Sequence, residues 1–488
     1  MKRRLLAVAV TALALVGLGG AFGAPPERWA GEPPVAPTDP LVRSIEQAQR
    51  RLREVPGDWR TWAELGSAYV EQARITGDPG YYPRAEGALH ESLRLRPASL
   101  AGADGSGNGG KGGVGNGIQR GAGGGKGGDL NAGGGTGGER NGGDDAGGRV
   151  QDERDRIGGN DLALVGLGAL ANARHDFGQA ERLARQAIRI NAYSADAHGV
   201  LADALTQLGR PAEATEAVQA MLDLRPGLPA LSRAAYDLEQ HGRVDEARGL
   251  WTAALATAVA PADVAFVRQQ LGDLAWHAGD LAAARAEYQA GLAARGDYLP
   301  LRHGMARVDV AEGRSEPALT AYAELAAASP TPSLLVEHAE LLRSLGRAAE
   351  ADAQLALAGA ALDLLAAGGG ADDLAAAELA LARGDHAAAV RLAGAEWARR
   401  RHTDVADTLA WALHQAGRSA EALPYARAAE ALGARSARYA YHLGMIELAL
   451  GDRAGARRDL ARALDLNPHF SPLDAPAAAR ALALAGAS

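Results

Sequence analysis

Enzymatic or metal-dependent chemistry would need nucleophiles, bases or ligands at a characteristic spacing, and few residues of this sequence come close. Histidine stands beside or near aspartate at His175–Asp176 and at His402 and Asp404, which could serve as acid–base pairs or contribute metal ligands. Neither pair belongs to an H-E-x-x-H or G-x-S-x-G motif, and both lie where turns between helices are expected. The sequence has no cysteine, which excludes thiol catalysis and Cys-ligated metals. We therefore expect no catalytic residue, no metal ligand and no cofactor, while pairs formed by distant residues stay open.

Two glycine-rich stretches imitate ligand-binding loops. Residues 105–111 have the glycines and the lysine of a phosphate-binding loop, but Gly112 stands where Ser or Thr is required and no strand precedes it. Residues 124–129 resemble a single turn of a calcium-binding nonapeptide roll, which needs the motif in tandem. Because residues 101–158 show no apolar periodicity, we interpret them as a disordered insertion.

The net charge and the N-terminal residues indicate which classes of partner and which location to expect. The formal net charge is −8, and no basic stripe is present, which argues against a nucleic-acid partner because such binding depends on neutralising phosphates. Residues 1–24 combine three basic residues, an apolar run and small residues, as in a secretory signal. We expect cleavage near Gly23 or Ala24, followed by a proline-rich linker at residues 25–40. In the alternative, residues 1–24 stay as an anchor, which would be the chain's only membrane attachment.

A hexapeptide that starts with glycine and ends with alanine recurs at intervals of 33 to 38 residues. Glycine ends a helix by adopting a left-handed conformation, and the closing alanine allows two helices to pack closely. An acidic residue at the start of the second helix suits the exposed N–H groups there. Each unit is therefore predicted to be helix, glycine turn, helix. The copies begin at Gly209, Gly242, Gly279, Gly313, Gly346, Gly384, Gly417 and Gly451.

The helix expected before the glycine has its own pattern. Trp62, Leu65, Gly66 and Tyr69 form W-x2-L-G-x2-Y, which resembles the tetratricopeptide repeat. Position 8 of the unit is always Gly or Ala, and position 24, in the second helix, is aromatic or aliphatic in most units. The resemblance implies an all-α solenoid of about ten helical hairpins. The ten units begin near residues 59, 161, 195, 228, 265, 299, 332, 370, 403 and 437.

The predicted domain organisation follows from these units. Residues 41–100 hold an N-terminal capping helix and the first repeat, residues 159–470 hold about nine further repeats, and residues 471–488 hold a C-terminal capping helix and tail. The glycine-rich insertion separates the first two repeats.

In this family the first helices line a concave groove that receives a peptide or a partner helix, at positions 2, 5, 9 and 12 of the unit. The same Trp and Tyr residues could instead pack between repeats, and the sequence leaves both alternatives open. The repeats contain no lysine, so the lysine-dependent carboxylate clamp of family members that hold chaperone C-termini is absent. The resemblance implies groove positions for Tyr236, Glu239, Gln269, Asp273, Trp276, His303, Arg307, Glu340, Arg343, Asp407, Trp411 and Tyr441.

These features predict a non-catalytic scaffold that binds a partner protein or peptide outside the cytoplasm. Two alternatives are a cell-surface module that displays the glycine-rich segment and an enzyme with a cryptic site. The sequence predicts neither the identity of the partner nor the oligomeric state.

Overall fold

The computed structural model describes residues 40–76, 78–98, 159–367 and 370–486, and within these ranges the chain forms twenty-two α-helices and no strand. The described residues from Ser44 onward form one compact unit, while the preceding unit is described only from Pro40, at the start of α1. The predicted leader, the linker up to residue 39 and the glycine-rich insertion lie outside the described residues. None of the helices in these ranges is long and apolar enough to cross a membrane.

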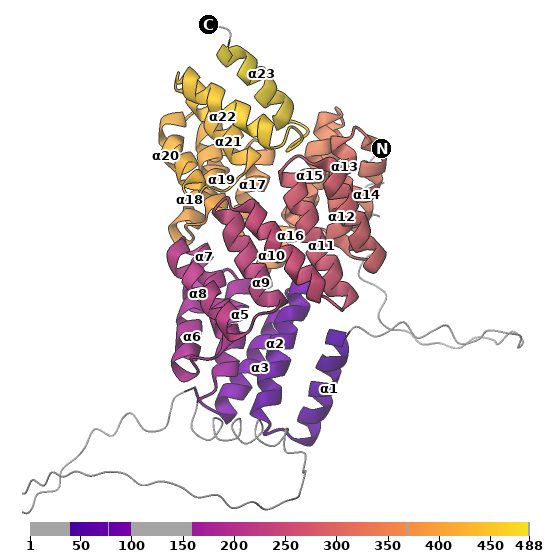
Figure 1. Ribbon diagram of the computed structural model, residues 1–488, viewed down its shortest axis with the longest axis vertical. Coiled ribbons are helices and arrows are strands. Elements are labelled where there is room, and N and C mark those ends of the chain that lie inside the picture. The colour runs from indigo at the N-terminus through magenta and orange to yellow at the C-terminus, as the bar shows by residue number, and fades with distance from the viewer. Residues whose placement is uncertain (1–39, 77, 99–158, 368–369, 487–488) are drawn as a thin grey trace, which may run out of the picture. The chain divides into compact units, whose positions relative to one another are not determined.

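The helices between α1 (Pro40–Glu54) and α23 (Asp474–Gly486) pack consecutively as ten hairpins, and each hairpin contacts the next (Figure 1). The predicted all-α solenoid of helical hairpins is thereby confirmed. The hairpins are α2 (Trp59–Thr76) with α3 (Tyr81–Leu95), α5 (Asp161–Ala173) with α6 (Phe177–Ile190), α7 (Ala195–Gln207) with α8 (Pro211–Leu224), α9 (Leu228–Gln240) with α10 (Val244–Thr257), and α11 (Pro261–His277) with α12 (Leu281–Ala294). They continue as α13 (Leu299–Ala311) with α14 (Ser315–Ala328), α15 (Pro332–Ser344) with α16 (Ala348–Ala367), α17 (Asp373–Ala382) with α18 (His386–Arg399), α19 (Thr403–Gln415) with α20 (Ser419–Glu430), and α21 (Ala437–Ala449) with α22 (Arg453–Leu466).

The turn inside each hairpin follows the predicted chemistry. All eight hexapeptide glycines have positive φ, between 70° and 85°, as the left-handed turn requires. The next residue is either an aspartate whose side chain accepts a backbone N–H of the following helix, as Asp280 does from Ala283, or an arginine. In four of the five hairpins of the second kind the arginine pairs with a glutamate three residues on, as in Arg243 with Glu246, whereas Arg314 pairs with Asp309 and Glu312.

Small residues at position 8 allow the two helices of a hairpin to approach. A Cβ added to Gly272 would lie 2.3 Å from the ring of Tyr288, which occupies position 24 and is fully buried. Tyr288, Trp251, Tyr322 and Leu355 each form the centre of successive hairpins and keep at most 2 % of their surface exposed. The predicted core positions of both helices are therefore confirmed, and the remaining face of each first helix is free to line an interior.

Candidate functional site

The first helices of seven consecutive hairpins, from α9 to α21, line a common cavity of about 810 Å³. Position 9 of the repeat faces this cavity in five of these units. The position 9 residues that line it are Tyr236, Arg307, Glu340, Glu378 and Trp411. The turn between α22 and α23 completes the wall with Asn467, Phe470 and Ser471.

The cavity exists because late hairpins return to contact early ones. The Tyr236 hydroxyl lies 3.3 Å from Nε2 of His402, and Thr403 Oγ1 donates to Gln240 at 3.2 Å. The turn after α7 is also close to the turn after α18, because a Cβ added to Gly209 would lie 2.5 Å from the Arg401 carbonyl oxygen. Farther along, Ser471 donates a hydrogen bond to Glu340. The three hydrogen bonds join segments that are 131 to 166 residues apart in the sequence.

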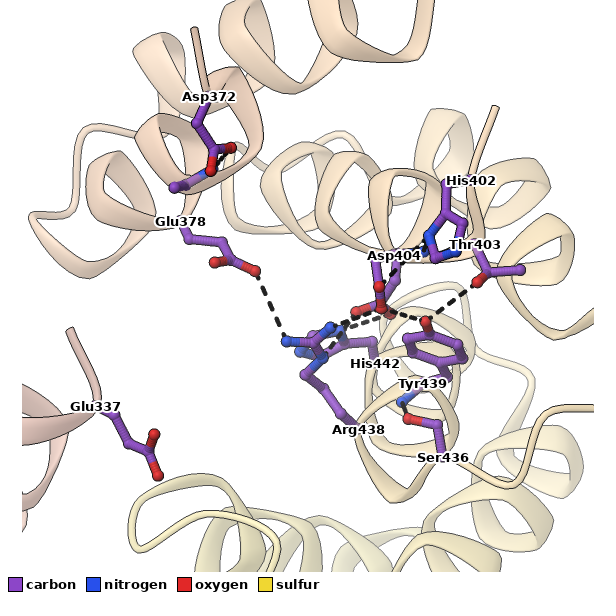
Figure 2. Close-up of polar contacts among 12 residues, drawn as sticks. Glu337, Asp372, Glu378, His402, Thr403, Asp404, Ser436, Arg438, Tyr439 and His442 are labelled. Carbon is purple, nitrogen blue, oxygen red and sulfur yellow. Dashed lines mark hydrogen bonds and ion pairs between the residues drawn. The ribbon is translucent and has the colours of Figure 1, made fainter. Parts of the chain in front are cut away.

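Arg438, at the start of α21, holds together one side of the cavity. Its guanidinium forms ion pairs with Asp404 and Asp407, each at 3.3 Å, and with Glu378 at 3.7 Å. Figure 2 shows the guanidinium between Glu378 on one side and Asp404 on the other. Desolvation alone would lower the pKa of Arg438, but the three carboxylates outweigh it and raise that pKa above its ordinary value.

The same group reaches the aromatic side chains of α19 and α21. His442 Nδ1 lies 2.8 Å from Asp407 Oδ1, and the His442 ring stacks on Trp411 with centroids 4.1 Å apart. Tyr439 donates a hydrogen bond to Asp404. Desolvation raises the pKa of Asp404, but His402 and Arg438 outweigh that effect and hold the pKa below its ordinary value.

A second ionic group lies on α13 and α15. Glu337 accepts from Arg307 Nε at 2.8 Å, lies 2.8 Å from His303 Nε2 and accepts from the Tyr322 hydroxyl at 3.0 Å. Burial opposes the charged carboxylate, but Arg307 and His303 together lower the pKa of Glu337 below its ordinary value. Glu337 is therefore ionised and fully partnered.

Two other carboxylates in the wall have no cation beside them among the described residues. Glu239 accepts from Trp251 Nε1 at 3.1 Å, and Glu340 accepts from Ser471. Desolvation raises the pKa of each to about 7, and these single hydrogen bonds only partly offset it. Near neutral pH, each therefore exchanges readily between its charged and neutral forms.

The structure brings seven of the twelve predicted groove residues to this cavity. Trp276, Asp407 and Tyr441 are buried, with at most 8 % of their surface exposed. Trp276 and Tyr441 pack in hydrophobic clusters between neighbouring helices, which is the second of the two arrangements that the sequence left open. Their role in binding stays a prediction. The seven are Tyr236, Glu239, Trp276, Arg307, Glu340, Asp407 and Trp411.

The other five predicted residues make contacts within the array. Gln269 donates to Asp273 at 3.0 Å, and Asp273 accepts from the buried Tyr288. His303 contacts Glu337, Arg343 donates to the Ala382 carbonyl, and Tyr441 packs near Phe470.

Several charged residues that organise the site were not among the predicted groove positions. Asp404 and Arg438 stand at position 2 of their units, and Glu378 stands at position 9. Both positions belong to the predicted groove set of 2, 5, 9 and 12, so the repeat pattern could have identified these three residues as well. Glu337 and His442 stand at position 6, which the register does not include. The proximity of His402 to Asp404 in the sequence reflects an ion pair of 3.4 Å at the start of α19. No cluster of metal-ligating side chains occurs within the described ranges.

Comparisons with known proteins agree with the repeat pattern. Tetratricopeptide-repeat models match residues 171–236 and 437–470. No curated protein sequence matches the chain. Among solved structures, PilF from Pseudomonas aeruginosa is 23% identical, with 42% of this chain and 92% of that chain covered and a TM-score of 0.35. A tetratricopeptide repeat protein from Parabacteroides merdae is 19% identical, with 53% of this chain and 98% of that chain covered and a TM-score of 0.33. The human IFIT1 dimer with PPP-AAAA is 14% identical, with 80% of this chain and 78% of that chain covered and a TM-score of 0.43.

The two family matches, together with ten hairpins built on one repeating pattern, identify the chain as a tetratricopeptide-repeat protein. Proteins of this class generally act as non-catalytic scaffolds for protein–protein interactions, using the surface that their stacked repeats create.

Proposed function

We propose that this protein is a non-catalytic scaffold outside the cytoplasm, and that it binds a segment of a partner protein in the cavity lined by its first helices. The observation that supports this most directly is that position 9 of five units faces one cavity of about 810 Å³. A wall that combines aromatic, arginine and carboxylate side chains has the composition of a protein-binding surface.

A site-specific crosslinking experiment tests the proposed binding site. Ser333 lines the cavity and is exposed, whereas Thr320 is exposed on the second helix of the preceding hairpin and does not line it. A photoreactive amino acid would replace each residue in turn, and crosslinked peptides from the extracytoplasmic fraction would be identified by mass spectrometry. We expect one defined partner segment joined at position 333 and not at position 320. Equal labelling at both positions, or no product at 333, would contradict the proposal.

The proposed location rests on residues 1–24, whose basic, apolar and small segments resemble a secretory signal. Cell fractionation followed by N-terminal sequencing tests it. We expect the protein outside the cytoplasm, with a new N-terminus near residue 24 if the leader is cleaved. Recovery of the full-length chain in the cytoplasm would contradict export.

A further inference from the structure

The wall of the cavity carries more negative than positive side chains. Eight carboxylates and four arginines line it. Arg438 is paired with Asp404 and Asp407, and Arg307 with Glu337. Arg248 is paired with Asp245, so among the described residues Arg435 is the one arginine of the wall without an ion pair. The three paired arginines are poor binding groups for an anionic ligand.

Glu340 and Asp474 form an unmatched pair of carboxylates in this wall. Ser471 Oγ donates to Glu340, and the same oxygen accepts from the backbone N–H of Asp474 at 2.8 Å. The charge of Asp474 adds to desolvation in raising the pKa of Glu340. Neither carboxylate forms an ion pair with another described residue, and desolvation raises the pKa of Asp474 although His442, a hydrogen bond from Tyr441 and Arg438 oppose that effect.

Asp407 adds a second and independent sign of missing donors. This residue is 1% exposed, and its Oδ2 accepts no hydrogen bond. Arg438 Nε lies 3.3 Å from that oxygen but does not form a hydrogen bond with it. Asp407 therefore keeps one carboxylate oxygen without a hydrogen-bond donor although Arg438 lies beside it, which is unfavourable for a buried acceptor.

Aromatic side chains and the volume of the cavity define the size and nature of such a ligand. Tyr236, Trp276 and Phe470 contribute aromatic surface to the wall, and aromatic faces attract cations. The volume of about 810 Å³ lies within the range of pockets that enclose small organic molecules.

We propose that the cavity binds a small organic cation, whose ammonium or guanidinium group lies beside Glu340 and Asp474. This inference rests on the proposed function, since it assigns ligand chemistry to the same cavity. The cation can be a free amine or the side chain of a lysine or arginine in the partner segment.

Isothermal titration calorimetry on the full-length chain at pH 8 tests the inference. The probes are agmatine, spermidine and the blocked peptide acetyl-Gly-Arg-Gly-amide, with acetyl-Gly-Gln-Gly-amide as the neutral control. We expect at least one cation to bind, and Glu340→Gln and Asp474→Asn each to weaken it by about tenfold or more, as for loss of one charge-assisted hydrogen bond. Glu216→Gln is the matched control, because Glu216 is exposed on α8 and does not line the cavity.

The arms of the experiment separate the sources of the cation. Tighter binding of agmatine or spermidine indicates a free amine, whereas tighter binding of the arginine peptide indicates a partner side chain. Absence of binding by every cation, or unchanged affinity in both folded cavity variants, overturns the inference. If crosslinking at position 333 persists in that case, the proposed function stands alone. If cations bind but no partner is crosslinked, only the proposed function fails.

Discussion

Asn467 donates a hydrogen bond from Nδ2 to the backbone carbonyl of Trp276 at 2.8 Å, although 191 residues separate them. Asn467 ends α22, and Trp276 lies in the last turn of α11, so this bond joins the tenth hairpin to the fifth. Asn467 is 1% exposed, and the bond gives its buried side-chain N–H group an acceptor. It is the clearest single contact between the late and early parts of the array.

Replacing Asn467 with alanine should therefore weaken folding. Asn191 is a matched control, because it also ends the second helix of a hairpin and also accepts a backbone N–H two residues later. We expect Asn467→Ala to lower the free energy of unfolding by about 0.5–1.5 kcal/mol, since one buried hydrogen bond is lost while the Trp276 carbonyl still accepts from the Gly279 N–H. Asn191→Ala should have a smaller effect, because its side chain instead reaches the partly exposed Asp161. Chemical denaturation measures both, and equal losses would mean that the long-range bond contributes little.

The turn glycines offer a test of the contact between early and late hairpins. Gly242 and Gly346 share nearly the same positive φ, 70° and 75°, so alanine introduces the same backbone strain at each. A Cβ at position 242 would lie 2.3 Å from the Gly433 carbonyl oxygen, whereas no atom lies within 4 Å of a Cβ at 346. We expect Gly242→Ala to be more destabilising than Gly346→Ala by about 1–2 kcal/mol. Thermal melts that shift equally would refute a close contact at Gly242.

A similar comparison tests the packing within a hairpin. Gly249 and Gly272 both lie inside helices, where alanine is intrinsically better than glycine by about 0.5–1 kcal/mol. Nothing lies within 4 Å of a Cβ at Gly249, so Gly249→Ala should raise the melting temperature. At Gly272 the added Cβ would collide with Tyr288, and we expect Gly272→Ala to destabilise the fold by about 1–3 kcal/mol. A gain in stability at both positions would mean that Tyr288 moves aside easily.

Stability should also depend on the protonation of Glu340. Desolvation raises its pKa in the folded chain to about 7, so between the ordinary value of 4.5 and 7 the folded state binds more protons than the unfolded state. The contribution of this group to stability is therefore fully present below pH 4.5 and is lost as the pH rises through 7. Glu340→Gln keeps the side chain neutral, and its stability relative to the native protein should increase from pH 5 to pH 8. Denaturation curves at these two pH values measure the difference, which a pH-independent offset would contradict.

Much of the fold could be predicted because its determinants are local. The hexapeptide at Gly242 places a left-handed turn between two helices, and this requires only the conformational preference of glycine and of its neighbours. Tyr288 and Gly272 are only 16 residues apart and pack within one hairpin, so the spacing of large and small residues was enough to identify the core. The position 9 register likewise brought Tyr236, Arg307 and Trp411 to one surface.

The sequence by itself thus determined the repeat, the hairpin and the face of each first helix that lines the interior. Only the tertiary structure decided that the late hairpins return to α9 and α11, and that Arg438 with its partners Asp404 and Asp407 lines the resulting cavity. The physical reason is that the path of the array depends on small rotations between neighbouring hairpins, which add up over many repeats. The accumulated rotation cannot be predicted from the sequence of any single repeat. The bond between Asn467 and Trp276 is therefore found only in the tertiary structure.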